Sequence, residues 1–306
     1  MKSHRTCNDI NPNNTAEARA KRNAWVERRL VEAAEKDAER YGILLRRFRS
    51  GYINLQSVKQ RLRIEKFCLI NNPVTDLEII EHLWVSMANG DHSSPTIIRP
   101  YTVWTFEYPR VGFGTLEDYD LSADIIFNTL YFFTKQGNLV VDPMAVGGVV
   151  GDVCKVMKRK CRMFGVNPFR DDIEEWDMHV QGFPKIGEAA DLVFWNPQQQ
   201  QNDISMIKST AEGLRDNETK LLAFLISDFF NGHSENNIFF EDYTNIFIRA
   251  GWKHAATIQC PLSKSRYSNG QVERARYEQK LLPLARSLVI FENTAALQSQ
   301  EKEVSA

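Results

Sequence analysis

Apolar and polar positions recur with different periods in two parts of the chain. From Ala16 to Phe48, apolar residues return every three to four positions, which predicts one long amphipathic helix that stops at Gly51. Its apolar stripe consists of Leu30, Ala34, Ala38, Tyr41, Leu45 and Phe48. Thr75 and Glu78 then supply the capping-box pattern of a further helix. Residues 1–99 are therefore predicted to form a mostly helical extension.

From Pro100 onward, short apolar runs alternate with helical patterns, as in parallel βαβ units. The apolar runs predict strands at 138–142, 162–166, 191–195, 221–227, 257–260 and 287–291, after an extended segment at 102–106. The helical patterns predict helices at 121–134, 149–159 and 241–251. Together these elements predict an α/β domain over residues 100–293, followed by a polar tail at 294–306.

The composition is that of a soluble globular protein. Of the 306 residues, 43% are apolar and 25% charged, which excludes collagenous, disordered and disulfide-scaffold chains. The longest unbroken apolar run, Leu221 to Ile226, is too short to cross a bilayer, so we expect an intracellular protein of the cytoplasm or nucleoid. The five cysteines form no Cys-x-x-Cys pair and the histidines no metal-ligand spacing. We therefore expect neither a disulfide framework nor a bound metal.

Charge is distributed unevenly. Residues 1–66 hold 16 Lys+Arg and 8 Asp+Glu, a net charge of +8, whereas residues 67–306 hold 22 and 31, a net charge of −9. A basic segment favours binding to a polyanion, because Lys and Arg beside phosphates release condensed counterions. We expect DNA as the partner, with RNA as the alternative polyanion. The arginines expected to contact phosphates are Arg28, Arg29, Arg46, Arg47 and Arg49. The alternative is that these charges form only the solvated face of a docked helix.

A glycine-bearing turn follows the predicted strand that ends at Asp142. The stretch reads Leu139-Val-Val-Asp-Pro-Met-Ala-Val-Gly-Gly-Val-Val-Gly-Asp152. Glycines let the backbone approach a ligand, and both the carboxylate and the amino terminus of the next helix are aimed at that ligand. The turn has no P-loop lysine, so the carboxylate suits an amino-bearing or cationic ligand better than a phosphate.

A second polar step, Asn196-Pro197, ends the predicted strand 191–195. It places an amide side chain and a backbone carbonyl at the edge where α/β sheets bind ligands. Two hydrogen-bond acceptors at this edge can hold an amino group in place. The alternative is an ordinary turn, since Asn-Pro begins many turns.

Taken in this order, the two stretches resemble the AdoMet-dependent DNA amino-methyltransferases, which act on adenine N6 or cytosine N4. That family combines an Asp-Pro-Phe/Met-x-Gly-x-Gly-Thr loop with a later (Asp/Asn)-Pro-Pro-(Tyr/Phe/Trp) strand end. The corresponding stretches here are Asp142-Pro-Met-Ala-Val-Gly-Gly-Val149 and Asn196-Pro-Gln-Gln199. The resemblance implies a class I methyltransferase-like, Rossmann-like domain with a mainly parallel sheet and a C-terminal antiparallel hairpin.

The resemblance continues on both sides of these motifs. Residues 103–106 and 131–138 look like the lead-in to the family's first strand, and 168–177 look like the segment whose acid faces the AdoMet adenine. Residues 250–252 and 274–291 look like the final helix and hairpin. The likeness therefore covers residues 100–293.

The family pattern also implies a role for each matched site residue. The residues implied to bind AdoMet are Asp142, Met144, Gly147, Gly148 and Asp177. Asn196 and the Pro197 carbonyl are implied to orient the target amine for in-line attack on the methyl group. A base within duplex DNA would have to be flipped out to reach them.

The chain departs from the family pattern at four features of this site. Val146 and Val149 replace a glycine and the threonine of the loop, and Gly165 stands where the family carries an acid that clasps the ribose. Gln198-Gln199 replaces the second proline and the aromatic that stacks on the flipped base. Trp195 is a candidate to replace that aromatic.

Two functions are compatible with this mixture of matches and departures. The first is an AdoMet-dependent methyltransferase acting on an exocyclic amino group of a DNA base, with weak cofactor binding. The retained Asp142, Asp177 and Asn196-Pro197 favour it. The alternative is a catalytically inactive methyltransferase-like protein that binds nucleic acid or a partner subunit, which the four departures favour.

Overall fold

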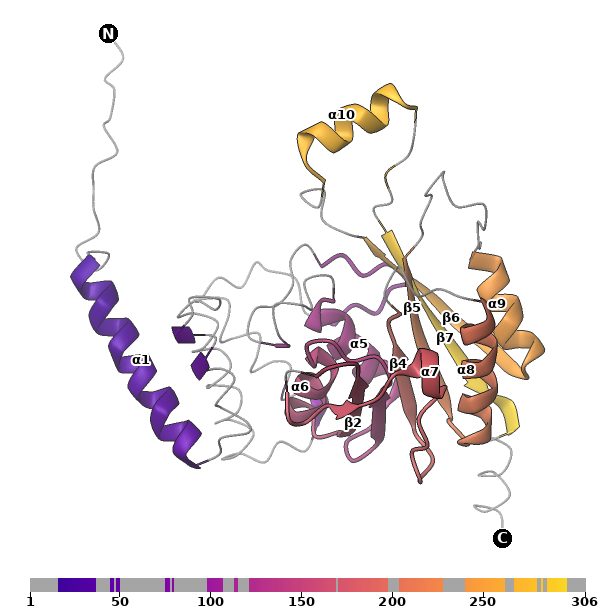
Figure 1. The fold of residues 1–306 in the computed structure, drawn as a ribbon, viewed down its shortest axis with the longest axis horizontal. Coiled ribbons are helices and arrows are strands. Elements are labelled where there is room, and N and C mark those ends of the chain that lie inside the picture. Colours follow the sequence, from indigo (N-terminus) through magenta and orange to yellow (C-terminus); the bar gives the residue numbers. More distant parts are fainter. Residues whose placement is uncertain are drawn as a thin grey trace.

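The computed structural model of the chain describes residues 16–36, 45–46, 48–49, 75–77, 79, 98–106, 113–114, 121–168, 170–197, 204–227, 240–261, 267–279, 282 and 285–295. Within these residues, seven strands form one mixed sheet in the order β3-β2-β1-β4-β5-β7-β6 (Figure 1). The strands are β1 (Leu139–Asp142), β2 (Lys160–Gly165), β3 (Glu174–Glu175), β4 (Leu192–Trp195), β5 (Leu221–Ser227), β6 (Trp252–Pro261) and β7 (Ala285–Asn293).

The direction of the strands completes the fold assignment. β1 pairs in parallel with β2 and with β4, β2 pairs in parallel with β3, and β4 pairs in parallel with β5. β7 is antiparallel to both β5 and β6. This topology is the class I methyltransferase-like, Rossmann-like arrangement, so the predicted fold class is confirmed.

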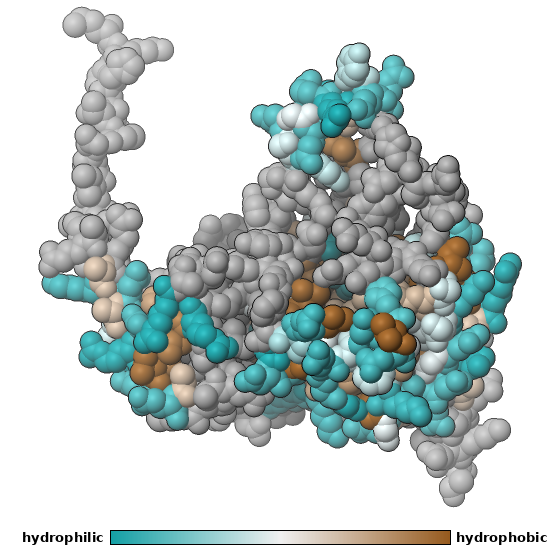
Figure 2. Space-filling model, viewed as in Figure 1, coloured by the Kyte–Doolittle hydropathy of each residue, from teal (hydrophilic) through white to brown (hydrophobic). Residues whose placement is uncertain are grey.

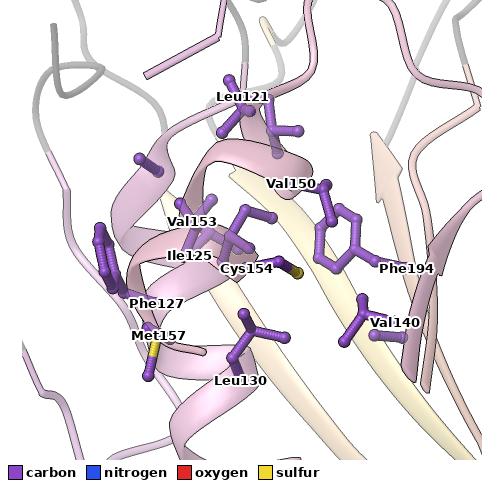
Figure 3. Close-up of a cluster of buried hydrophobic side chains, with 14 of the residues drawn as sticks. Leu121, Ile125, Phe127, Leu130, Val140, Val150, Val153, Cys154, Met157 and Phe194 are labelled. Carbon is purple, nitrogen blue, oxygen red and sulfur yellow. The ribbon is translucent and has the colours of Figure 1, made fainter. Parts of the chain in front are cut away.

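Helices cover both faces of the sheet (Figure 1). The described helices are α1 (Ala16–Lys36), α5 (Ala123–Phe133), α6 (Val149–Val156), α7 (Met178–Gln181), α8 (Ile204–Asp216), α9 (Phe240–Arg249) and α10 (Asn269–Tyr277). α5 and α6 pack on one face, in a cluster with Val140 and Phe194 that Figure 3 shows. α8 and α9 pack on the other face, against Val141 and Trp195.

The central strands are apolar at nearly every position because both of their faces are covered. Every residue of β1 and of β4 is buried. Val140 faces the α5 and α6 layer, whereas its neighbour Val141 faces the opposite layer. This alternation is the period of a strand, and burial on both faces explains why these strands read as continuous apolar runs.

All predicted strands are present, but the sequence analysis missed several other elements. β6 and β7 are longer than predicted, and β3, α7, α8 and α10 were not predicted. α8 carries its buried residues Ile207, Ala211 and Leu214 at helical spacing, so the periodic signal existed. β3 has only two residues, both exposed, and gives no apolar run to read.

The extended segment predicted at 102–106 covers one edge of the sheet. Trp104 N donates to the Gln259 carbonyl at 2.8 Å, and Gln259 N donates to the Thr102 carbonyl at 2.8 Å. Val103 therefore forms a parallel bridge with β6. The Trp104 indole is buried and stacks on Phe132 of α5, which ties this edge to the helical layer.

Part of the region before residue 100 packs on the α/β body. Ile79 is fully buried in the cluster that contains α5 and α6. Asp76 accepts two hydrogen bonds from the buried Arg159 guanidinium, at 2.5 and 2.7 Å. The division of the chain at residue 99 stays a prediction, and the structure shows that residues near 76–79 belong to the same packed core as the sheet.

The predicted amino-terminal helix is present over the described part of its range. α1 buries Val26 and Leu30 completely, in agreement with an apolar stripe at helical spacing. A shorter helical pattern in the sequence runs from about Ser57 to Lys66, and the helix that it predicts lies outside the described residues. Across the described residues, every helix is too short or too polar to cross a membrane.

Candidate functional site

The two polar motifs meet where the strand order reverses. β1 and β4 are hydrogen-bonded neighbours, with Val141 beside Val193, although the chain passes through β2 and β3 between them. Asp142 ends β1, and Asn196 directly follows β4. Ligands of open α/β sheets bind in the crevice at this kind of switch point, at the carboxyl ends of the strands.

A hydrogen bond joins the two motifs directly. The Trp195 indole N–H donates to the Met144 sulfur at 3.1 Å. Met144 N in turn donates to Asp142 Oδ1 at 3.1 Å. The turn after β1 and the end of β4 therefore form one connected unit.

The hypothesis that Trp195 stacks on a target base is wrong. Its side chain is fully buried and lies against Phe224 and Phe247, with ring centroids 4.7 and 6.4 Å away. In a strand that is buried on both faces, each side chain points into one of the two cores. Trp195 is the last residue of β4, and its side chain points toward α9. Sequence alone does not reveal which face the last strand residue takes.

The glycine turn has the backbone geometry of a ligand-binding loop. Gly148 has φ +78° and ψ 28°, a left-handed conformation, and it is the residue before the first turn of α6. No side chain caps this helix start. The first backbone N–H groups of α6 and the buried Asp142 carboxylate are thus presented at the same edge of the sheet.

Arg170, which sequence analysis missed, holds this turn in place. Its guanidinium donates to the Gly147 carbonyl at 3.1 Å and to the Gly148 carbonyl at 3.4 Å. It also pairs with Asp152 of α6 at 3.0 Å and with Asp172 at 2.7 Å. A Cβ at Gly148 would lie 2.7 Å from the Arg170 Cζ. Glycine is therefore required there both by the left-handed backbone and by this close approach.

The electrostatics of this network keep it ionised. Burial alone would raise the pKa of Asp172, but the hydrogen bond and the charge of Arg170 outweigh it and hold that pKa well below its ordinary value. Lys155 adds a further hydrogen bond to Asp172 at 2.9 Å. Burial would lower the pKa of Arg170, yet Asp152 and Asp172 raise it above its ordinary value. The ion pairs therefore persist at neutral pH.

Backbone atoms lie close to Gly165, the position at which the resemblance implies an acid that clasps the ribose. A Cβ at Gly165 would lie 2.3 Å from the Ala145 carbonyl oxygen, well inside van der Waals contact. Ala145 N donates to the Phe164 carbonyl at 2.7 Å, which fixes the turn against the end of β2. The Ala145 carbonyl therefore occupies the space that a side chain at 165 would need, and such a side chain requires the turn to move.

Asp177 has a local structural role. It is the N-cap of α7, and its Oδ1 accepts a hydrogen bond from His179 N at 2.9 Å. The preceding Trp176 N donates to the Gly165 carbonyl at 2.9 Å, so the segment adjoins the end of β2. Asp177 thus lies one strand away from the glycine turn, on the side where the resemblance implies the adenine of AdoMet.

Asn196 and Pro197 are half-buried and lie at the edge of the described residues. Within that part of the chain, the Asn196 side chain makes no hydrogen bond, in contrast to Asn128, Asn138 and Asn217, which all do. Gln198 and Gln199, the departures from the family motif, lie outside the described residues. The amide and the Pro197 carbonyl are the acceptors that the sequence predicted at this edge.

The groups gathered here suit an amino-bearing ligand. They comprise a buried carboxylate, two kinds of carbonyl acceptor and the backbone N–H groups of a helix start. Among the described residues, no group of three or more His, Cys, Asp or Glu is placed to hold a metal ion. The site can thus bind and orient an amino-bearing ligand and accept hydrogen bonds from it.

Two of the five arginines predicted to contact phosphates are engaged in ion pairs. Arg29 pairs with Glu32 at 3.0 Å on the surface of α1. Arg49 pairs with Glu27 at 2.7 Å, which brings the segment around residue 49 beside α1. Surface pairs of this kind contribute little stability, so a phosphate can replace the carboxylate at small cost.

The other three arginines leave the prediction open. Arg28 and Arg46 are exposed, and Arg47 lies outside the described residues. Trp25 is half-exposed on α1, with the Arg29 guanidinium 5.7 Å from its ring centroid. Basic side chains beside an exposed aromatic ring are a common feature of nucleic-acid surfaces.

No sequence-family model and no curated protein matches this chain. Solved structures resemble it at low identity. A SAM-dependent methyltransferase from Archaeoglobus fulgidus is 11% identical, with a TM-score of 0.39 over 57% of this chain and 96% of its own. M. jannaschii TYW2 in complex with AdoMet is 14% identical, with a TM-score of 0.33 over 53% of this chain and 72% of its own. Likenesses at this level concern the fold alone, and the strand order described above defines that fold.

Proposed function

We propose that the protein is an AdoMet-dependent methyltransferase that acts on an exocyclic amino group of a nucleic-acid base, adenine N6 or cytosine N4 in DNA. The observation that carries the proposal is the meeting of Asp142 and Asn196 at the carboxyl ends of two neighbouring parallel strands, at the switch point of the sheet. The class I methyltransferase-like topology supports the same reaction type.

The residues present fit one end of AdoMet better than the other. The left-handed Gly148 turn, the start of α6 and the buried Asp142 suit its charged amino-acid group. At the ribose end, Gly165 offers no carboxylate and the Ala145 carbonyl lies against it. We therefore expect weak binding that depends on Asp142 and Asp177. AdoMet, when bound, supplies an electrophilic methyl group.

In this proposal Asn196 and Pro197 orient the target amine. The Asn196 side-chain oxygen and the Pro197 carbonyl accept the two N–H bonds of the amine, which aims the nitrogen lone pair along the line of attack. The methyl group would pass from the AdoMet sulfur to the amine nitrogen as the S–C bond breaks, S-adenosylhomocysteine would leave with that electron pair, and the methylated amine would then lose a proton to solvent. Orientation is the contribution of these residues, since both are acceptors and neither is a strong base.

The first experiment measures AdoMet binding by calorimetry. Asp142→Asn is expected to weaken binding by about tenfold or more, because one charge-assisted hydrogen bond contributes roughly 1.5–3 kcal/mol. For Asp177 the informative variant is Asp177→Ser, since serine keeps the N-cap of α7 while removing the charge. Equal binding by the wild type and Asp177→Ser would remove Asp177 from the cofactor site.

The second experiment measures transfer of tritiated methyl groups from AdoMet to DNA. We expect slow transfer by the wild type and none by Asn196→Ala. The Asn196→Ala variant should still bind AdoMet, which separates loss of the chemistry from loss of the cofactor. Transfer at an unchanged rate in Asn196→Ala would overturn the role given to this residue.

A second candidate function is supported by one specific observation. The Ala145 carbonyl fills the place of the ribose-clasping side chain at Gly165, so this half of the site has been reshaped rather than only mutated. A protein without catalysis that retains the fold for binding nucleic acid or a partner subunit would show this feature. Absence of any AdoMet binding, together with retained nucleic-acid binding, would favour it over the enzyme.

A further inference from the structure

The connection between β6 and β7 leaves the sheet at the same edge as the candidate site. The end of β5, Ser227, pairs with Arg286 at the start of β7, and the end of β6, Pro261, pairs with Ala285. Because β5 runs parallel to β4 and β1, the end of β6 and the start of β7 lie at the carboxyl ends of the parallel strands. We call residues 262–284 the hairpin arm.

The described part of the arm contains a complete helix that is held away from the body (Figure 1). α10 has a capping box, in which Ser268 and Gln271 satisfy each other's backbone N–H groups. Ala275 is its only buried residue. Isolated helices shorter than roughly 12–15 residues are marginal in water, so a helix of this length that packs so little is suited to completing its packing on a ligand.

The exposed side chains of α10 include two arginines and a tyrosine, beside the acidic Glu273. Arg274 and Arg276 are 80% and 71% exposed, and Tyr277 is 91% exposed. Figure 2 shows α10 as a hydrophilic projection at the top of the molecule. Among the described residues, the two arginines pair with Glu278 and Glu273 of the same exposed segment, and such pairs exchange readily for other anions.

The charge of the arm contrasts with that of its surroundings. Residues 262–284 contain five Lys+Arg and two Asp+Glu, a net charge of +3, whereas residues 67–306 as a whole have a net charge of −9. A polyanion approaching the candidate site is therefore attracted by the arm and repelled by most of the body. Cationic side chains next to an exposed aromatic ring match a nucleic-acid strand, with phosphates on the arginines and a base on the ring.

We propose that the hairpin arm is a nucleic-acid-binding element, in which Arg274 and Arg276 contact phosphates and Tyr277 stacks on a base beside the candidate site. This proposal rests on the proposed function only for the identity of the substrate. Binding to the arm requires neither AdoMet nor methyl transfer.

The test uses the full chain and a fluorescently labelled 20-nucleotide single-stranded DNA, titrated without AdoMet over a range of salt concentrations. Arg274→Gln/Arg276→Gln is expected to flatten the slope of log affinity against log salt by about 1.4, since each phosphate contact on a single strand contributes about 0.7. Glutamine preserves helix propensity near that of arginine. Circular dichroism checks that each variant is folded.

A matched control lies on the same helix. Glu273→Gln/Glu278→Gln removes the acidic partners and leaves both arginines, so it is expected to tighten binding while the arginine variant weakens it. Tyr277→Ala is expected to weaken binding by about 5-fold to 150-fold with an unchanged salt slope, because stacking is not screened by salt. Duplex DNA and RNA of the same sequence, titrated in parallel, identify the preferred strand.

Two results would overturn the proposal. The first is an arginine variant with wild-type affinity and salt slope. The second is that Tyr277→Ala weakens binding to poly-glutamate, titrated in the same way, as much as it weakens binding to DNA. That result would point to an acidic protein partner instead. The outcome is separable from the proposed function, because methyl transfer can be absent while the arm binds DNA, and the arm can be inert while transfer persists.

Discussion

Polar side chains have different hydrogen-bond surroundings at the two ends of the parallel strands. At the amino ends, the buried Arg159 guanidinium donates to both Asp76 oxygens and to the carbonyls of Leu130, Thr134 and Met157. At the carboxyl ends, Asn196 makes no side-chain hydrogen bond within the described residues. We call the amino edge closed, because protein partners surround the Arg159 charge there.

A second ion pair lies at the same closed amino edge. Asp191 precedes β4, accepts a hydrogen bond from Leu139 N at 2.8 Å and pairs with Lys220 at 2.7 Å. These contacts join the first residue of β1 to the residues that directly precede β4 and β5. These amino-edge polar groups therefore serve the fold. We expect their mutation to lower stability, and mutation of Asn196 at the carboxyl edge to affect function more than stability.

The largest effect is expected at the closed edge, from Asp76→Ala. This change leaves the fully buried Arg159 charge without its partner, and breaking a buried ion pair in this way costs about 3–5 kcal/mol of unfolding free energy. Urea denaturation measures it. The control is Glu174→Ala, whose partner Arg162 is partly exposed, and which should cost less than about 1 kcal/mol. Equal costs in the two variants would contradict the distinction between buried and exposed pairs.

The next effect concerns Arg170, which forms a buried ion-pair network at the carboxyl edge. Arg170→Met is expected to cost about 1.5–3 kcal/mol of stability, since it removes charge-assisted hydrogen bonds while Lys155 still pairs with Asp172. It should also weaken AdoMet binding, because the Gly147 and Gly148 carbonyls lose their donor. Arg162→Met is the matched control, since Arg162 also pairs with an acid near β2 but does not contact the turn.

The pH dependence of stability tests the same network. The pKa of Asp172 is depressed in the folded protein, so its ion pair stabilises the fold above the ordinary aspartate pKa of about 3.8 and is lost as the pH falls toward the depressed value. In Arg170→Met this depression is reduced. The wild type should therefore lose more stability than the variant between about pH 4 and pH 2. Parallel curves for the two proteins would exclude Arg170 as the cause.

The sequence predicted what short-range pattern determines. β1 is apolar up to Asp142, its last residue, and β4 is apolar throughout and is followed by Asn196, so these polar residues mark the carboxyl edge. Arg170 could not be predicted, because it acts on carbonyls 22 and 23 residues earlier in the chain, and no period in the sequence encodes that approach. The same holds for Gly165, whose neighbour Ala145 comes from the other side of α6 in the chain.

The sequence was also misleading at one position for a physical reason. Trp195 adjoins Asn196 in the chain, which suggested that both face the ligand. In a strand, successive side chains point to opposite faces, so adjacency along the chain separates side chains rather than uniting them. The Trp195 ring accordingly packs on Phe224 while donating to Met144.

A smaller effect is expected from Gly165→Asp, which would restore the family acid. Its Cβ would overlap the Ala145 carbonyl, so we expect a loss of about 1–3 kcal/mol of stability and no gain in AdoMet affinity. Gly165→Ala introduces the same Cβ without the charge and serves as the control. Tighter AdoMet binding by the aspartate variant, with little loss of stability, would show that the turn moves freely and that the site accepts an acid at this position.

The smallest effect on stability is expected at Asn196, and this prediction sharpens the contrast between the edges most directly. Asn196→Ala removes a half-buried side chain that makes no hydrogen bond within the described residues, so its unfolding free energy should lie within about 0.5 kcal/mol of the wild type. The control is Asn128→Ala, since Asn128 is fully buried and its amide both donates to the Asp124 carbonyl and accepts from Arg99 N, at 2.8 Å each. That change should cost about 1–3 kcal/mol. Thermal denaturation of both variants, beside the methyl-transfer assay, decides the matter. If Asn196→Ala proves as destabilising as Asn128→Ala, then Asn196 serves the fold, and the carboxyl edge is closed in the same way as the amino edge.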